Sequence, residues 1–254
     1  MKDLTDARIF YINLENRVDR RKHFESQAAL LTMPHVQRIP AVQGSSVDVF
    51  NDRRLGANTR VQIITEYRRS HYEIHSRGAI GASLSHLLAW KTFLKTGAKY
   101  GLILEDDVEL PATFSMMVRD SAKDLPPKWD IWILGWNHNP VDLENKTPHP
   151  FKQIMHFVGA HCYIITRNTA KILVENMFPI ETHVEHYMSN MAFLKKLKIV
   201  RDTRLYMPQI DYDIMESDIR KPDGCPACVV NDKKTAIEAR VINMNHNFKI
   251  KRLG

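Results

Sequence analysis

Cysteine is scarce in this chain of 254 residues, which has only three. Cys162 lies in a predicted strand, and Cys225 and Cys228 form a single CxxC pair. A structural zinc site would need two further Cys or His ligands, and the nearest downstream candidate, His246, does not stand at a known finger spacing. A thioredoxin-like pair should open a helix after an early strand, whereas this pair lies in a loop with Pro and Gly. We therefore expect a loop staple or an incidental pair.

Long apolar runs are also absent, and none approaches the length of a membrane span. Residues 1–6 have neither the apolar core nor the small-residue cleavage site of a signal peptide. We therefore expect a cytoplasmic protein without a transmembrane segment. With 44% hydrophobic and 26% charged residues, the composition is typical of a soluble globular protein.

The formal net charge of +7 suggests an anionic partner. Zinc-finger spacing, leucine heptads and an aromatic RNA-binding signature are missing, so we do not expect nucleic acid. A nucleotide diphosphate and acidic lipid headgroups are the remaining candidates, and the second would make the protein peripheral to a membrane. Solubility alone is the other explanation. The basic residues cluster at Arg17, Arg20, Arg21 and Lys22, at Arg68 and Arg69, and at Lys249, Lys251 and Arg252.

Strand and helix signals alternate along the chain, which predicts one α/β domain over residues 1–254. Strands are predicted at residues 9–12, 36–41, 102–104, 130–135 and 199–200, with one more inside 156–166. Helices are predicted at 17–31, from Ser83 or Ser85 to 94, at 111–119, at 169–177 after an Asn168 cap, and at 185–197.

Two segments lack this periodicity. Residues 45–76 are charged and poor in apolar side chains, so we expect a long loop or an excursion over the site. Three roles are open for it: closing over a bound ligand, binding a second ligand, or forming a homodimer. Residues 208–254 are expected to be irregular because Pro, Asp and Gly recur there.

The most informative motif is the acidic triplet Glu105-Asp106-Asp107, which follows the apolar residues 102–104. Such a run is typical of a buried strand, and open α/β sheets hold ligands at the carboxyl ends of their strands. Adjacent carboxylates repel one another unless cations partner them. Mg²⁺ or Mn²⁺ is held by one or two carboxylates with substrate phosphates filling its remaining positions, so a divalent ion is a candidate partner. A solvated acidic turn is the alternative.

Blocks of sequence matching one known family occur in order along most of the chain. They are residues 11–14 with Arg17, Asp19, Arg20 and Arg21, then 38–44, 78–86, 104–107, 129–135, 159–165, and Ser217 with Asp218. Each block is weak alone, but the ordered set resembles glycosyltransferase family 25, which contains lipooligosaccharide and procollagen galactosyltransferases. The resemblance implies an α/β fold of GT-A type, with a central mixed, mostly parallel sheet flanked by helices.

The resemblance further implies an inverting, metal-dependent transfer of a hexose, galactose first, from a UDP-sugar to a hydroxyl of a glycan or glycoprotein. Asn13 and Leu14 would then lie at the uracil or ribose. Arg17 would be the first of the three nearby arginines to approach the diphosphate, unless these arginines only form a solvated helix face. Ser85 and His86, which would otherwise cap a helix and pack on a strand, would join the donor pocket.

In this scheme the triplet stands at the metal-binding motif, with Mn²⁺ or Mg²⁺ held by its outer members. Residues two apart on an extended segment share one side, so Glu105 and Asp107 can converge while Asp106, also part of the donor site, faces elsewhere. Asp107 is the expected direct ligand. Glu105 would reach the ribose, or the metal through water.

Inversion also needs a base for the acceptor hydroxyl, and Glu185 and Asp218 are the candidates. The family often has aspartate where Glu185 stands, so this chain differs by one methylene. The alternatives are an exposed helix carboxylate for Glu185 and a turn or helix-cap residue for Asp218. His161 is expected to be a core histidine. Two other functions remain open for the chain: a noncatalytic sugar-nucleotide or glycan-binding protein, and a metal-dependent phosphohydrolase.

Overall fold

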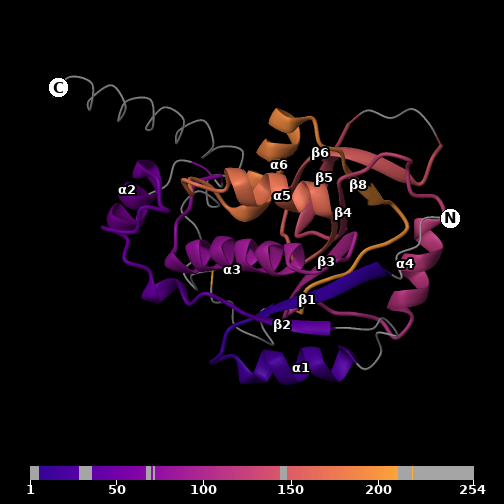
Figure 1. The fold of residues 1–254 in the computed structure, drawn as a ribbon, viewed down its shortest axis with the longest axis horizontal. Helices are drawn as coiled ribbons and strands as arrows, with labels where there is room; N and C mark the ends of the chain where they lie inside the picture. The colour runs from indigo at the N-terminus through magenta and orange to yellow at the C-terminus, as the bar shows by residue number, and fades with distance from the viewer. Residues whose placement is uncertain are drawn as a thin grey trace, which may run out of the picture.

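The computed structural model describes residues 6–28, 36–66, 70, 72–143, 148–210 and 219 (Figure 1). Its strands are β1 Ala7–Asn13, β2 Val36–Pro40, β3 Tyr100–Glu105, β4 Ile131–Gly135, β5 His138–Asp142, β6 Phe151–Val158, β7 Cys162–Thr166 and β8 Ile199–Asp202. Its helices are α1 Val18–Ala28, the 3₁₀ helix η2 Gly44–Ser46, α2 Ala57–Thr65, α3 Arg77–Leu94, α4 Phe114–Ala122, α5 Arg167–Asn176 and α6 Val184–Lys195.

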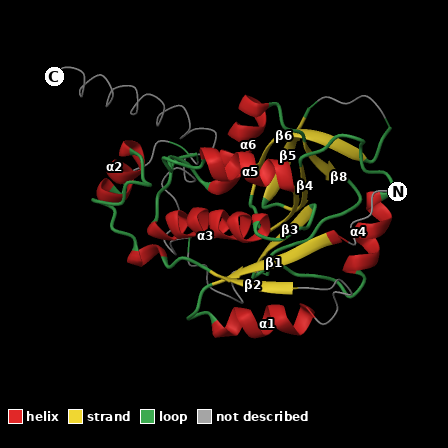
Figure 2. Cartoon of the chain, viewed as in Figure 1, coloured by secondary structure: helices red, strands yellow, loops and turns green. Residues whose placement is uncertain are grey.

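All eight strands form one sheet in the order β2-β1-β3-β7-β4-β8-β6-β5, with helices packed around it (Figure 2). β1 runs parallel to β2 and β3, and β4 runs parallel to β8. The other four neighbouring pairs are antiparallel. β6 and β7 therefore run antiparallel to the other six strands of the sheet. The predicted mixed, mostly parallel sheet of an α/β fold is therefore confirmed.

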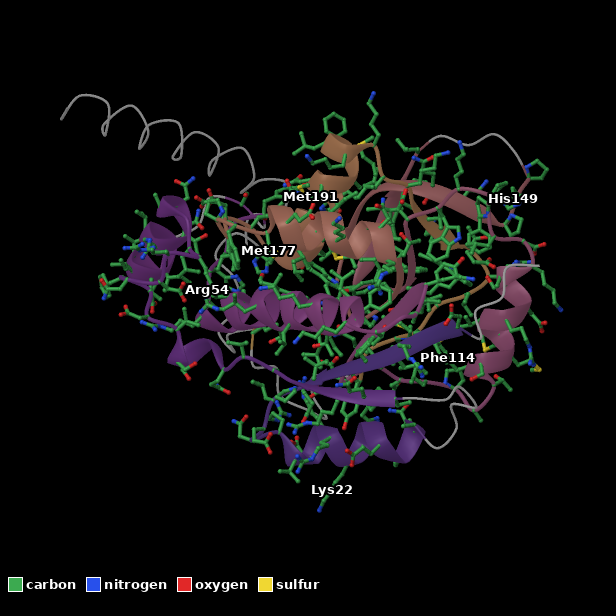
Figure 3. The ribbon with its side chains drawn as sticks, viewed as in Figure 1. Lys22, Arg54, Phe114, His149, Met177 and Met191 are labelled. Atoms are coloured by element: carbon green, nitrogen blue, oxygen red, sulfur yellow. The ribbon has the colours of Figure 1, made fainter. Side chains whose placement is uncertain are left out.

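The sheet buries both of its faces, which explains why its central strands are continuous apolar runs. Ile103 belongs to the core under α3, α5 and α6, whereas its neighbours Leu102 and Leu104 belong to the core under α1 and α4. Figure 3 labels Met177 and Met191 of the first core and Phe114 of the second.

Helix α3 begins earlier than predicted. The expected start at Ser83 or Ser85 is wrong, because Ser76 caps the helix and its hydroxyl accepts a hydrogen bond from Ala79 N. Glycine in the first turns hides this start from a propensity argument. Close packing requires glycine at position 81, because a Cβ atom on Gly81 would lie 2.5 Å from Val42 O.

Other differences have equally local causes. Thr166 caps α5 in place of Asn168, and 156–166 contains parts of two strands, β6 and β7. The segment 45–76 contains helix α2, which the sequence does not predict. The buried face of α2 is polar, with Thr59 donating to Ile180 O, so hydrophobic periodicity cannot reveal it.

Several expectations concern residues with little or no description. Arg68, Arg69, Cys225, Cys228, and the basic residues Lys249, Lys251 and Arg252 lie outside the described residues, as does most of 208–254. Cys162 is a free, buried thiol whose pKa is raised by burial. Across the described part of the chain, no helix combines the length and apolar character needed to cross a membrane.

Candidate functional site at the carboxyl ends of β1 and β3

Two parallel neighbours, β1 and β3, end side by side, and this pairing brings Asn13 next to the acidic triplet. The Asn13 amide nitrogen donates to Asp106 Oδ2 at 2.6 Å and to Arg17 O at 3.0 Å. Its amide oxygen accepts from Arg38 Nε at 2.9 Å. Asn13 is buried and fully engaged, so its side chain holds the site together in this structure.

The outer carboxylates of the triplet converge on one hydrogen-bond donor. Gln209 Nε2 lies 3.0 Å from Asp107 Oδ1 and 3.4 Å from Glu105 Oε2, whereas Asp106 turns towards Asn13. The outer carboxylates approach each other as expected, but the expected extended segment is wrong, because Asp106 and Asp107 lie in a turn after β3 in which Val108 N donates to Glu105 O at 3.3 Å. That Glu105 and Asp107 hold a metal ion stays a prediction.

The arginine that pairs with the triplet is Arg20. Arg20 NH1 lies 2.9 Å from Asp107 Oδ2 and 3.3 Å from Asp106 Oδ1, and the arginine is 6% exposed. Arg17 instead forms an ion pair with Asp19 at 2.8 Å. Arg20 therefore does not belong to a solvated helix face. That Arg17 contacts the diphosphate remains a prediction.

Burial and mutual repulsion dominate the electrostatics of the triplet. Burial and the Asp107 charge raise the pKa of Asp106 to about 6, against the opposing effects of Asn13 and Arg20. Burial and the Glu105 charge raise the pKa of Asp107. Burial also acts to raise the pKa of Glu105, but its hydrogen bond with His86 and nearby positive charge outweigh it and lower the pKa. Ionised, the triplet carries three negative charges against the single charge of Arg20.

A buried hydrogen-bond relay fixes Glu105. Trp90 Nε1 donates to the Tyr163 hydroxyl at 2.8 Å, and this hydroxyl lies 2.9 Å from His86 Nδ1. Because an ionised Glu105 can only accept, we infer that His86 Nε2 carries the hydrogen of their bond, and in the neutral imidazole Nδ1 then accepts from the Tyr163 hydroxyl. His86 Nε2 then donates to Glu105 Oε1 at 3.1 Å.

The Ser85 hydroxyl is engaged in two hydrogen bonds to backbone atoms. It donates to Gly81 O at 2.6 Å and accepts from Val42 N at 2.8 Å, which ties α3 to the end of β2. Leu14, half-buried, accepts from Arg17 N through its carbonyl. His161 is a buried core histidine, as expected, with Nε2 bonded to Met207 O at 2.9 Å, whereas its buried Nδ1 has no hydrogen-bond partner among the described residues.

The triplet is covered by residues 207–210, which sequence reasoning missed. Ile210 N donates to Asp107 O, and Glu109 N donates to Pro208 O, each at 2.8 Å. These bonds hold Gln209 over the outer carboxylates. In the sequence, Gln209 is 104 positions from Glu105 and 102 positions from Asp107, so no local pattern could have identified it.

The donor set fits a divalent ion that is completed by a ligand. Among the described residues, no group of three or more His, Cys, Asp and Glu side chains could hold a metal ion alone. Two convergent carboxylates with an excess of negative charge match Mg²⁺ or Mn²⁺, which commonly takes one or two carboxylates and the phosphates of a substrate. Binding there requires the Gln209 amide nitrogen to turn away from the carboxylates.

Glu185 lies in the first turn of α6, within electrostatic reach of this site. Its pKa is raised by burial and by the charge of Glu105, while His186 and His86 act against the rise. A carboxyl with a raised pKa near a negatively charged site can accept a proton. Asp218, the other predicted base, lies outside the described residues.

A histidine pair stands beside Glu185 and was not predicted. His156 Nε2 lies 2.6 Å from His186 Nδ1, which connects β6 to α6. The half-exposed Tyr72 ring contacts both imidazoles, with centroids 5.4 Å from His156 and 4.5 Å from His186. Burial lowers the pKa of His156.

Sequence comparison gives curated relatives that are larger than this chain. Procollagen galactosyltransferase 1-A of Xenopus laevis is 27% identical over 146 residues, covering 56% of this chain and 23% of the relative. Procollagen galactosyltransferase 2 of Homo sapiens is 26% identical over 136 residues, covering 50% of this chain and 20% of the relative. A glycosyltransferase 25 family member of Drosophila pseudoobscura pseudoobscura is 31% identical over 112 residues, covering 44% and 17%. The chain thus spans about a quarter or less of these three proteins.

Solved structures with similar arrangements are distant in sequence. A UDP-glucose pyrophosphorylase complexed with UDP-glucose has a TM-score of 0.44 at 9% identity, covering 80% of this chain and 91% of that chain. A glucose-1-phosphate thymidylyltransferase from Bacillus anthracis, described as putative in its title, has a TM-score of 0.43 at 10% identity, covering 77% and 86%. These likenesses are too remote to bear on function.

The family model described as glycosyltransferase family 25 (LPS biosynthesis protein) matches residues 6–188. The match includes both strands that build the site, the acidic triplet and Glu185. This protein belongs to glycosyltransferase family 25.

Proposed function

We propose that the protein is an inverting glycosyltransferase that moves a hexose, galactose first, from a UDP-sugar to a hydroxyl of a glycan or glycoprotein. The observation that carries the proposal is the convergence of Glu105 and Asp107 on Gln209 Nε2 at the carboxyl edge of the sheet. Family membership and relatives named procollagen galactosyltransferases support it.

The donor would bind across the ends of β1 and β3. Glu105 and Asp107 would hold Mn²⁺ or Mg²⁺, and Arg20 keeps Asp107 in place through the buried ion pair. The bound ion would supply a Lewis acid that offsets charge on the departing diphosphate. Asn13 and Leu14 lie where β1 ends, next to the triplet, and we place the uridine there.

Glu185 would act as the base. The acceptor oxygen attacks the anomeric carbon as its bond to the β-phosphate oxygen breaks, and the hydroxyl proton passes to the Glu185 carboxylate. Attack opposite the leaving diphosphate inverts the anomeric configuration. The raised pKa of Glu185 makes its carboxylate a stronger base than an ordinary glutamate.

The test is transfer from a panel of UDP-hexoses to glycan and glycopeptide acceptors, with Mn²⁺ or with EDTA. We expect one hexose to be transferred, transfer to stop in EDTA, and Glu185→Gln to abolish it. The exposed Asp120→Asn on α4 is the matched control and should retain full activity. Free sugar released despite abundant acceptor would instead support a phosphohydrolase, and tight UDP-sugar binding without turnover would support a noncatalytic binding protein.

Two predictions about assembly stand beside this proposal. A homodimer and membrane contact through the basic clusters first noted in the sequence remain predictions. Of those clusters, only the one at Arg17, Arg20, Arg21 and Lys22 lies within the described residues, and Arg20 there is committed to the acidic triplet.

A further inference from the structure

The amino ends of β3, β4 and β8 form the sheet edge opposite the candidate site. Six lysines are exposed along this edge or on the adjoining helix ends. We call them the basic edge: Lys95, Lys99, Lys128, Lys195, Lys196 and Lys198. Within the described part of the chain, none of the six forms an ion pair with a carboxylate.

Backbone hydrogen bonds show that the basic edge is continuous. Arg167 N donates to Lys99 O at 3.0 Å, and Thr166 N donates to Asp130 O at 3.1 Å. Asp130 N in turn donates to Lys198 O at 2.9 Å. Three strand spacings thus separate Lys99 from Lys198, a span of about 15 Å.

Acidic side chains do not neutralise this surface. The chain has no Asp or Glu between Glu185 and Asp202. Asp130, at this edge, accepts from Lys198 N at 2.8 Å and from the Thr169 hydroxyl at 3.2 Å. Its single negative charge offsets only a small part of the six positive charges of the basic edge.

Two large apolar side chains project from the same place. Phe193 is 80% exposed and Leu194 is 68% exposed, in the last turn of α6 immediately before Lys195 and Lys196. The preceding residues Met191 and Ala192 are buried, so the helix is anchored while its tip is not covered. An exposed aromatic and an exposed aliphatic side chain directly followed by two lysines match the interfacial zone of an anionic membrane.

We propose that the basic edge, with Phe193 and Leu194, docks the protein on an anionic lipid surface. The lysines would bind headgroups and the two apolar side chains would enter the boundary of the acyl chains. β3 extends from this edge to Glu105 over six residues, so the candidate site would stand about 20 Å from the docked edge. The proposal is independent of the glycosyltransferase chemistry.

The exposed apolar pair favours a membrane over nucleic acid. Nonspecific nucleic-acid binding depends on phosphate contacts from cations, and an aliphatic Leu194 contributes nothing to it. Lysine is also disfavoured at protein–protein interfaces, which argues against a second copy of this chain as the occupant.

The experiment is cosedimentation of the full chain with neutral phosphatidylcholine vesicles and with vesicles containing anionic phosphatidylglycerol. We expect binding to the anionic vesicles that weakens with salt. Phe193→Ser/Leu194→Ser should remove it, and Lys195→Ala/Lys196→Ala should lower the partition coefficient roughly 30-fold. Matched controls are Phe50→Ser, an apolar side chain on the excursion that is as exposed as Leu194, and Arg53→Ala/Arg119→Ala, with the same charge change at two exposed arginines away from the basic edge.

Three outcomes would overturn the proposal. The first is vesicle binding that the Phe193/Leu194 variant retains. The second is binding to duplex or single-stranded oligonucleotides, but not to vesicles, that is lost with the two lysines. The third is self-association in sedimentation velocity that the Phe193/Leu194 variant abolishes, with no vesicle binding.

Discussion

The amide nitrogen of Asn13 lies 2.6 Å from Asp106 Oδ2, a bond that joins the end of β1 to the residue after β3. Arg20 also approaches Asp106, at 3.3 Å. The middle carboxylate of the triplet is therefore occupied by the protein itself, while the outer two share Gln209. Asp107 shares Arg20 with Asp106, so the middle carboxylate differs from the outer two by its bond to Asn13. From this difference we predict a structural role for Asp106 and a binding role for Glu105 and Asp107.

Asp106→Ala should destabilise the fold, because it removes one buried partner of Arg20 and the acceptor of Asn13. We expect a loss of about 3 kcal/mol in the free energy of unfolding, measured by urea denaturation in EDTA. Asp106→Asn, which keeps the shape, should cost less. The exposed Asp120→Ala should unfold like the wild type, and equal stability of the two alanine variants would refute a structural role for Asp106.

Gln209→Glu should strengthen Mn²⁺ binding. It would place a third carboxylate beside Glu105 and Asp107 and remove the amide nitrogen that lies between them. We expect at least a tenfold gain in Mn²⁺ affinity, followed by electron paramagnetic resonance of the free ion, and lower stability without metal. Unchanged affinity would mean that the ion binds elsewhere.

Tyr163→Phe should loosen Glu105 without touching it. The change leaves Trp90 Nε1 and His86 Nδ1 without their shared hydroxyl, at a cost of about 1–3 kcal/mol. Mn²⁺ affinity should also fall, by roughly 10-fold or more, as is usual when a partner of a metal ligand is removed. Tyr187→Phe, which loses a hydroxyl bonded to Leu173 O, is the matched control and should keep its metal affinity.

The pH dependence of transfer should report Glu185. Because its pKa is raised above the ordinary glutamate value, the basic form is lost as pH falls through that higher pKa. We therefore expect kcat/KM to decline on the acid side at a pH above 4.5. Glu175→Gln, at an exposed position of α5, should retain the same profile. If Glu185→Gln keeps the full kcat/KM and the same decline at low pH, the base is another group.

The sequence locates the strands that carry the site because they are buried on both faces and so form unbroken apolar runs. Ile103 and its neighbours predict β3, and the triplet that follows marks the functional edge. The sequence could also have identified Arg20 as a buried residue. It stands four residues before Phe24 on α1, and both are buried, so helical spacing puts it on the inner face.

Other parts of the site depend on contacts that no local pattern contains. Gln209 contacts the triplet across a separation of about a hundred residues that includes β4 to β8, and a single glutamine between Pro208 and Ile210 carries no signal of such a contact. Helix α2 buries Thr59 and Gln62 while exposing Val61 and Ile64, which inverts the usual hydrophobic pattern. The histidine pair at His156 and His186 requires the packing of α6 on β6, which tertiary structure alone provides.

The central claim is that Glu105 and Asp107 hold a cation through which the diphosphate of the donor is bound. Isothermal titration of UDP into the protein, with Mn²⁺ and with EDTA, tests it most directly when the wild type is compared with Asp107→Asn and the remote Asp120→Asn. We predict tight UDP binding to the wild type and to Asp120→Asn only with Mn²⁺, and its loss in Asp107→Asn. Equal UDP affinity in EDTA and in Mn²⁺, or full affinity in Asp107→Asn, would contradict the claim.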